Sequence, residues 1–149
     1  MRFGSMLVLV LALLTRAAAA QAPAIKWGPA PPVFPAGAKL AVLQGDPSKQ
    51  ELFTVRLDFP PGYTIPAHFH PTDEHVTVIS GTLLVGMGDK ADFTHATVLP
   101  AGGFITAPAN ANHFARARGH TIVQVHAMGP FALTYVNPAD NPQQKAAGR

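Results

Sequence analysis

Cysteine is absent from this chain of 149 residues. Its absence excludes disulfides, thiolate zinc sites, iron–sulfur clusters and cysteine nucleophiles, so any metal ion must be held by nitrogen and oxygen ligands. Charged residues are also few, at 13%, whereas hydrophobic residues make up 48%. This composition supports an apolar core and argues against a disordered chain. The length suits a single domain.

The chain also lacks a concentrated basic region. Its formal net charge is +3, from 11 Lys and Arg against 8 Asp and Glu. The basic residues are scattered, and Arg116 and Arg118 form the only close pair. Proteins that track a phosphate backbone need a patch of such residues. We therefore expect no nucleic-acid partner.

The first 20 residues are typical of a secretory signal peptide. Arg2 provides a positive start, residues 6–14 (MLVLVLALL) are apolar throughout, and residues 17–20 are alanines. The apolar run is much shorter than the ~20 residues that span a bilayer, which favours a cleaved signal over an uncleaved anchor. We predict cleavage after Ala20, a periplasmic or secreted protein, and no membrane association of the mature chain.

The mature chain is rich in residues that interrupt helices. With 15 prolines and 13 glycines, the sequence favours short elements separated by turns. Residues 21–50 predict an extended Pro/Ala-rich arm with one short strand at 39–44, and residues 138–149 predict a polar, frayed tail. Residues 51–137 predict the folded domain.

Period-two alternation within residues 51–137 indicates half-buried strands. The expected strands cover residues 53–59, 75–79, 82–87, 104–106, 114–117, 121–126 and 131–136. We expect one hairpin across Ser80-Gly81 and another across residues 118–120. Short, regularly spaced strands without a helical stretch predict an all-β sandwich or barrel.

A group of metal-ligating residues lies between these strands. His68 and His70 are two residues apart, so on a strand their imidazoles lie on one face, about two 3.3 Å rises apart. Glu74 follows a short turn and begins the next strand. Imidazole nitrogen with carboxylate oxygen suits Mn, Fe, Co, Ni, Cu or Zn better than Ca or Mg. Two histidines at this spacing, taken alone, are also typical of a surface pair.

The spacing of these residues resembles the first cupin motif. Five residues separate Gly62 from His68, three separate His70 from Glu74, and six separate Glu74 from Gly81. The second cupin motif is matched by Gly102, Pro108 and His113, whereas Asn110 and Ala117 replace a glycine and an asparagine. Asn is the non-glycine residue that best tolerates a left-handed turn. The resemblance covers residues 53–136.

This resemblance implies a single cupin β-barrel, that is a double-stranded β-helix or jelly roll of short antiparallel strands. It also implies one divalent transition-metal ion (Mn, Fe, Ni, Cu or Zn) bound by His68, His70, Glu74 and His113. His75 is the rival to Glu74, because some cupins space this ligand one residue later. Strand alternation allows only one of the two to face inward. The gap to Gly81 favours Glu74, but a one-residue register shift would favour His75.

Three further residues are candidates for the pocket. His126 and Gln124 share a face of a late strand and are expected either near the metal or as structural groups bonded within the fold. Arg116 is a candidate for binding an anionic substrate. Family resemblance implies a metal-dependent oxidoreductase or dioxygenase acting on a small molecule. The alternative is a non-catalytic metal- or ligand-binding envelope protein, and the apolar arm is consistent with a homodimer.

Overall fold

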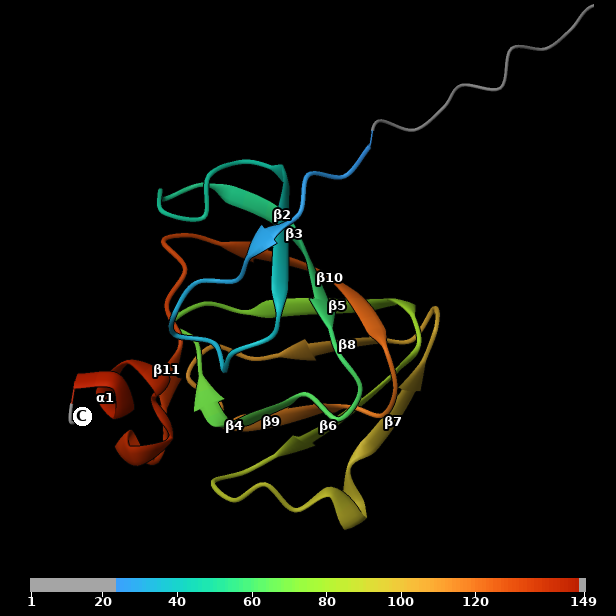
Figure 1. Ribbon diagram of the computed structural model, residues 1–149, viewed down its shortest axis with the longest axis vertical. Helices are drawn as coiled ribbons and strands as arrows, with labels where there is room; N and C mark the ends of the chain where they lie inside the picture. The colour runs from blue at the N-terminus through green and yellow to red at the C-terminus, as the bar shows by residue number, and fades with distance from the viewer. Residues whose placement is uncertain (1–23, 148–149) are drawn as a thin grey trace, which may run out of the picture.

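Two antiparallel sheets facing each other form the fold (Figure 1). The computed structural model describes residues 24–147, so the expected signal peptide lies outside the described residues. Sheet A has the strand order β1-β2-β3-β10-β5-β8, and sheet B has the order β11-β4-β9-β6-β7. The predicted all-β barrel is therefore confirmed.

The strands are short, as the sequence predicts. Sheet A consists of β1 (Gly28–Pro29), β2 (Lys39–Gln44), β3 (Leu52–Phe59), β10 (Thr121–Met128), β5 (Glu74–Ser80) and β8 (Phe104–Ala107). Sheet B consists of β11 (Thr134–Tyr135), β4 (Thr64–Phe69), β9 (His113–Ala117), β6 (Thr82–Met87) and β7 (Thr97–Pro100). Strands β2 and β6 have the bounds predicted from sequence. The expected strand at 131–136 shortens to two residues.

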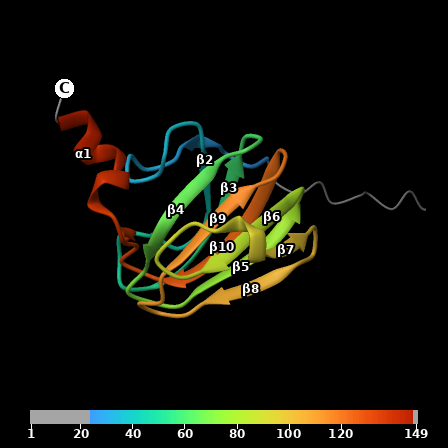
Figure 2. The ribbon, with the colours of Figure 1, turned by 90° about the horizontal axis from the view of Figure 1, so that it is seen from below.

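The two sheets face each other (Figure 2), and alternation of side chains along each strand builds the core between them. Along β3, Phe53, Val55 and Leu57 are at most 4% exposed and belong to one apolar cluster. Ala115 and Ala117 of β9 contribute to the same cluster from sheet B. Burying each large side chain contributes about 1.5–3 kcal/mol, so this cluster is the main source of stability.

The N-terminal arm is part of the barrel. Strand β1 pairs with β2, and β2 extends sheet A by pairing with β3. Two tyrosine hydroxyls hold the segment before β2, since Tyr63 donates to the Pro35 carbonyl at 2.6 Å and Tyr135 donates to the Val33 carbonyl at 2.8 Å. Residues 28–44 therefore form one wall of the folded domain.

Both hairpins predicted from sequence are wrong. Strand β5 belongs to sheet A, where it pairs with β8 and β10, whereas β6 belongs to sheet B. Strand β9 likewise pairs with β4 and β6, and β10 pairs with β3 and β5. The glycine-containing turns are corners at which the chain crosses from one sheet to the other. Local sequence does not separate such a corner from a hairpin turn, because glycine suits both, as at Gly81, where φ is +80°.

The C-terminal segment differs from the frayed tail that the sequence predicts. A 3-10 helix, η2 (Pro138–Asp140), is followed by α1 (Pro142–Ala147). A third short helix, η1 (Phe93–His95), precedes β7. The side chains of Asn137 and Asn141 accept hydrogen bonds from Ala139 N and Gln143 N, which explains where η2 and α1 begin. Among residues 24–147, no helix is long and apolar enough to cross a membrane.

Gly81 and Gly62 offer a matched test of the corner between β5 and β6. Both have left-handed φ values, +80° and +76°. A Cβ at Gly81 would overlap the His120 carbonyl oxygen and lie 2.7 Å from Thr121 Oγ1, whereas a Cβ at Gly62 meets nothing within 4 Å. Gly62→Ala should cost about 1–2 kcal/mol of unfolding free energy from backbone strain alone. Gly81→Ala should cost about 3 kcal/mol or more, because overlap adds to strain. Urea denaturation measures both, and equal losses would contradict this assignment.

Candidate metal centre

Four residues from two sheets meet at one end of the barrel interior. His68 on β4 and His113 on β9 are directly opposite each other on neighbouring strands of sheet B, and each is 3% exposed. His70 follows the end of β4. Glu74 is the first residue of β5 in the facing sheet A. The fold thus brings His68, His70 and Glu74 of the first motif next to His113 of the second motif.

The distances within this group match the space around one ion. One ring nitrogen each from His68, His70 and His113 lies within 4.8 Å of the others. The Glu74 carboxylate oxygen Oε2 lies 3.6 Å from His70 Nε2 and 3.6 Å from His113 Nε2. Ligand atoms bound to one ion at about 2.1 Å are themselves about 3.0–4.2 Å apart. The three imidazoles can therefore hold a metal ion, with Glu74 in reach as a fourth ligand.

Backbone carbonyls orient all three imidazoles in the same way. Each ring places its Nδ1 against a carbonyl oxygen, which only accepts hydrogen bonds, so Nδ1 carries the proton and Nε2 keeps a lone pair. The carbonyl partners are Pro66 for His68, Ala132 for His70 and Ala111 for His113, at 2.7, 2.7 and 3.0 Å. An anchored Nδ1–H with a free Nε2 is the usual arrangement of a metal-binding histidine.

Two nitrogen atoms of the site lack any partner. His70 Nε2 and His113 Nε2 are shielded from solvent and make no hydrogen bond to the described residues. Leaving a buried polar atom unpaired costs about 1–3 kcal/mol, so native proteins rarely do so without a reason. A metal ion between these atoms and the Glu74 carboxylate would satisfy both nitrogens. The residues present therefore fit a transition-metal ion.

The electrostatics of the group favour a cation. Burial, together with the neighbouring His113 and His70, lowers the pKa of His68 to about 3, so this imidazole stays neutral. Burial alone would raise the pKa of Glu74, but His113 and His70 more than offset it, and the pKa falls below its ordinary value. In turn Glu74 raises the pKa of His113 against the opposing effect of burial. A negative Glu74 carboxylate beside the neutral His68 imidazole favours a cation at this centre, and metal binding requires His113 to give up the proton that Glu74 favours.

The second motif contributes through a tight turn. Asn110 has a left-handed φ of +60°, the conformation for which cupin sequences place glycine here. Its backbone N–H donates to the His70 carbonyl oxygen at 2.8 Å, and the Asp73 carboxylate accepts from the backbone of Ala109 at 2.8 Å. The loop before His113 is thereby joined to the segment that carries His70 and Glu74.

His75 lies on the opposite face of β5 from Glu74. Its Nδ1 is 3.0 Å from Thr106 Oγ1, and its ring stacks against Phe104 with 6.2 Å between centroids. Phe104 is 58% exposed, which places this pair on the outer surface of sheet A. Strand alternation therefore directs Glu74 toward the three imidazoles and His75 away from them.

His126 and Gln124 lie on the outer face of sheet A, which favours the alternative that they are structural groups over a place in the pocket. His126 Nδ1 is 2.9 Å from Thr54 Oγ1, and Gln124 accepts a hydrogen bond from Arg56. The inward positions of β10 belong to Val123, Val125 and Ala127, which are 2–6% exposed. The consistently apolar character of these three residues was the sequence signal that favoured this orientation.

Arg116 also lies outside the site. It is exposed on the outer face of sheet B, where its Nε donates to Thr64 Oγ1 at 3.1 Å. Its guanidinium covers the Phe93 ring at 3.9 Å from the centroid, a cation–π contact. Arg116 therefore does not contact a ligand at the metal centre, contrary to the role considered for it from sequence.

A cavity of about 270 Å³ borders Glu74 on the side of the N-terminal arm; we call it the apolar chamber. Its lining includes Leu40, Val42, Phe53, Val55 and Leu57, and also Phe131. Sequence reasoning did not identify Phe131 or the arm as part of a site. No motif marks them, because they contribute apolar surface that only the fold brings next to Glu74.

Comparison with known families agrees with this geometry. The model of the cupin domain family matches residues 55–129, half of the chain. This chain is a cupin. A search of curated proteins finds no match.

Solved structures show the same fold at low sequence identity. A protein from Methylibium petroleiphilum, proposed to be an acetylacetone dioxygenase, is 23% identical, with a TM-score of 0.61 over 79% of each chain. An RmlC-like cupin from Shewanella frigidimarina is 24% identical, with a TM-score of 0.53 over 62% of this chain and 76% of its own. An oxalate oxidase is 26% identical, with a TM-score of 0.55 over 72% of this chain and 59% of its own.

Glu74 and His75 can be separated by matched substitutions. Glu74→Gln removes the negative charge while keeping the shape of the side chain, so the affinity for Mn²⁺ or Zn²⁺ should fall by about 10-fold or more. His75→Gln should leave the affinity unchanged, because this ring faces solvent. Isothermal titration calorimetry on metal-free protein measures both. A loss confined to His75→Gln would place the fourth ligand at His75 instead.

Proposed function

We propose that this cupin is an exported metalloenzyme that binds one divalent transition-metal ion on His68, His70, Glu74 and His113. We further propose that it acts as an oxidoreductase on a small molecule. One observation carries the proposal: the solvent-shielded Nε2 atoms of His70 and His113 have no partner and lie 3.6 Å from the Glu74 carboxylate. A purely structural core would satisfy such atoms or replace them with apolar groups.

The chain's own residues prepare the site in three ways. Hydrogen bonds from Nδ1 to carbonyl oxygens hold each imidazole with Nε2 toward the shared centre, so little reorganisation is needed on binding. Burial of His68 and His113 keeps bulk water away from them. The Glu74 carboxylate offsets part of a cation's charge. When bound, the ion would supply Lewis acidity toward an oxygen atom of a ligand and, for Mn or Fe, electron transfer.

The fold neighbours support the reaction class. One is named an oxalate oxidase and another is proposed to be an acetylacetone dioxygenase, and both names describe oxidation of small molecules. At 26% and 23% identity these names do not transfer a substrate. They favour redox chemistry over the alternative of a non-catalytic metal- or ligand-binding protein.

Oxygen consumption tests the enzymatic proposal. Protein loaded with Fe²⁺ or Mn²⁺ should consume oxygen with at least one member of a panel of small diketones, diols, phenols and organic acids. His68→Ala should lose bound metal and reduce the rate by about 100-fold or more, since the ligand set is broken. The control His126→Ala, on the outer face of sheet A, should keep both properties. Stoichiometric metal retention with no turnover across the panel would favour the binding protein.

Export is tested at the N-terminus. When the full-length chain is expressed in a Gram-negative host, we expect the mature protein in the periplasm, beginning at Gln21, because the preceding segment has the charge and hydrophobicity of a signal. Leu11→Asp places a charge in the apolar run and should leave the precursor in the cytoplasm. Mass spectrometry of fractionated cells measures both. An intact N-terminus on periplasmic or cytoplasmic wild-type protein would contradict cleavage after Ala20.

A further inference from the structure

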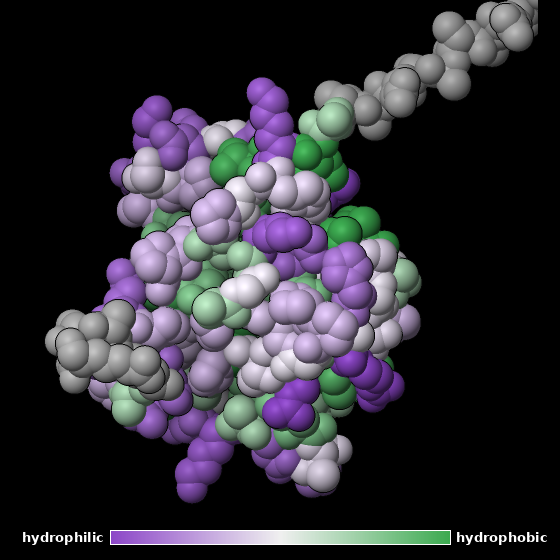
Figure 3. Space-filling model, viewed as in Figure 1, coloured by the Kyte–Doolittle hydropathy of each residue, from purple (hydrophilic) through white to green (hydrophobic). Residues whose placement is uncertain are grey.

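The chemistry of the apolar chamber indicates what enters it. The chamber lies between residues 31–34 of the N-terminal arm and the inner faces of β2 and β3, and Glu74 also lines it. Val42, which is 50% exposed, lies on its wall directly opposite Val55 of β3. The space-filling view shows hydrophobic patches among hydrophilic residues on the upper part of the molecule (Figure 3). The chamber therefore reaches the surface at an apolar, half-exposed side chain.

Charge in the chamber disfavours anions. Its ionisable lining groups are the two acids Asp46 and Glu74, and no Lys, Arg or His side chain lines it within the described part of the chain. In the metal-free protein, a carboxylate entering this space would lose its hydration and meet no cationic side chain on the lining, which is costly. A neutral apolar molecule would instead gain about 25 cal/mol for each Å² of surface removed from water.

The size of the chamber limits its occupant to a small molecule. An apolar cavity of about 150 Å³ stays dry and accommodates benzene. The chamber, at about 270 Å³, therefore admits a substituted ring or an aliphatic chain of similar bulk.

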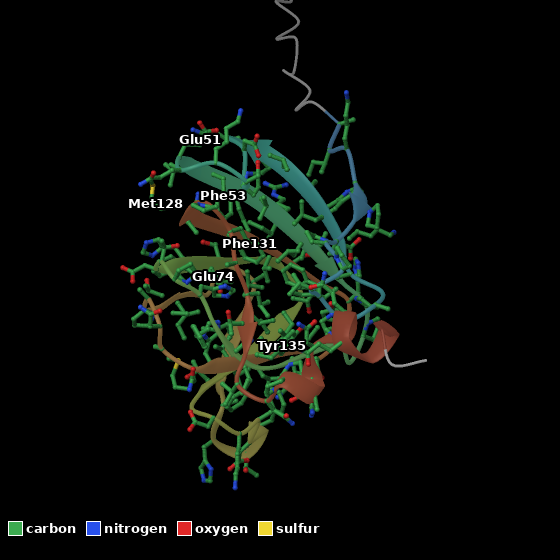
Figure 4. All side chains as sticks on the ribbon, turned by 90° about the vertical axis from the view of Figure 1, so that its left-hand side faces the viewer. Glu51, Phe53, Glu74, Met128, Phe131 and Tyr135 are labelled. Atoms are coloured by element: carbon green, nitrogen blue, oxygen red, sulfur yellow. The ribbon has the colours of Figure 1, made fainter. Side chains whose placement is uncertain are left out.

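Phe131 lies between the chamber and the His70 ring, near Phe53 and Glu74 (Figure 4). Its ring stacks on Phe34 of the arm with 5.8 Å between centroids, packs edge-on against Phe53 at 6.2 Å, and lies 5.5 Å from the His70 ring. The next residue, Ala132, provides the carbonyl that orients His70. Phe131 thus forms the wall between chamber and His70, and a ligand in the chamber faces the centre on the side of Glu74.

We infer that the apolar chamber is the ligand site of this cupin and that its lining, taken without the metal ion, favours small neutral, apolar molecules over carboxylates. The assignment rests on the proposed function, because it takes the metal centre as the reacting end of the chamber. Binding in the chamber itself needs no metal, so the two proposals are tested separately.

Toluene and benzoate form a matched pair of probes, since they have similar shapes and differ in charge. Titration of metal-free protein, followed by ¹H–¹⁵N NMR, should show toluene perturbing chamber residues such as Val55 and Leu57. Benzoate should bind at least about 10-fold more weakly, which corresponds to an unfavourable difference of about 1.4 kcal/mol. Comparable affinities, or no toluene binding, would overturn the inference.

Charge substitutions at the entrance provide the second test. Val42→Arg places a cation on the chamber wall and should reverse the preference toward benzoate, whereas Val42→Glu should weaken both probes. The neighbouring Leu43, 42% exposed and outside the chamber lining, gives the control Leu43→Arg, which should change neither affinity. Equal effects of the two arginine variants would overturn the inference.

Metal retention is measured on the same proteins and separates the two proposals. Toluene binding without metal binding would contradict the proposed function alone. Metal binding without toluene binding would overturn the chamber assignment alone.

Discussion

The metal centre depends on hydrogen bonds between imidazole Nδ1 groups and backbone carbonyls. Because a carbonyl only accepts, each contact fixes both the tautomer and the direction of the ring. Three rings fixed in this way present their Nε2 lone pairs to one space and leave two of those atoms without a protein partner. The rest of the barrel holds the carbonyls in place, so the precision of the site comes from the backbone.

Crossing between sheets explains why the ligands converge. His68 and His113 face each other within sheet B, while Glu74 approaches from sheet A. A simple hairpin of β5 and β6 would place both strands in one sheet, and Glu74 would lose its position across the interior. The left-handed corner at Gly81 allows the chain to change sheets within a single residue. The positive φ of Gly81 thus helps to place Glu74 across the barrel interior from the histidines.

The N-terminal arm and the segment after β10 give the site its surroundings. Phe34 and Phe131 both line the chamber and stack on each other, and the two tyrosine hydroxyls hold the arm against the barrel. The same segment that provides Phe131 provides the Ala132 carbonyl for His70. Packing of the chamber wall and orientation of a metal ligand are therefore joined through two consecutive residues. The polar metal ligands therefore lie at one end of the barrel interior, and apolar side chains line the chamber beside them.

The sequence by itself determined the all-β class, the bounds of β2 and β6, and the spacing that groups two histidines and a carboxylate. These features follow from local periodicity and turn chemistry, which each short segment carries within itself. Asn110 also adopts the left-handed turn expected of it.

Only the tertiary structure decided which strands pair, which face of β10 points inward, and what surrounds the centre. Pairing of β9 and β10 with other strands depends on contacts between residues far apart in the chain, which no local pattern specifies. The clearest case is His70, whose partner Ala132 lies 62 residues away. Strand alternation predicts that Gln124 and His126 share one face of β10. Whether that face points inward or outward is decided by the burial of Val123 and Val125 against the opposite sheet. Burial is a property of the assembled barrel, because it requires both layers to be present.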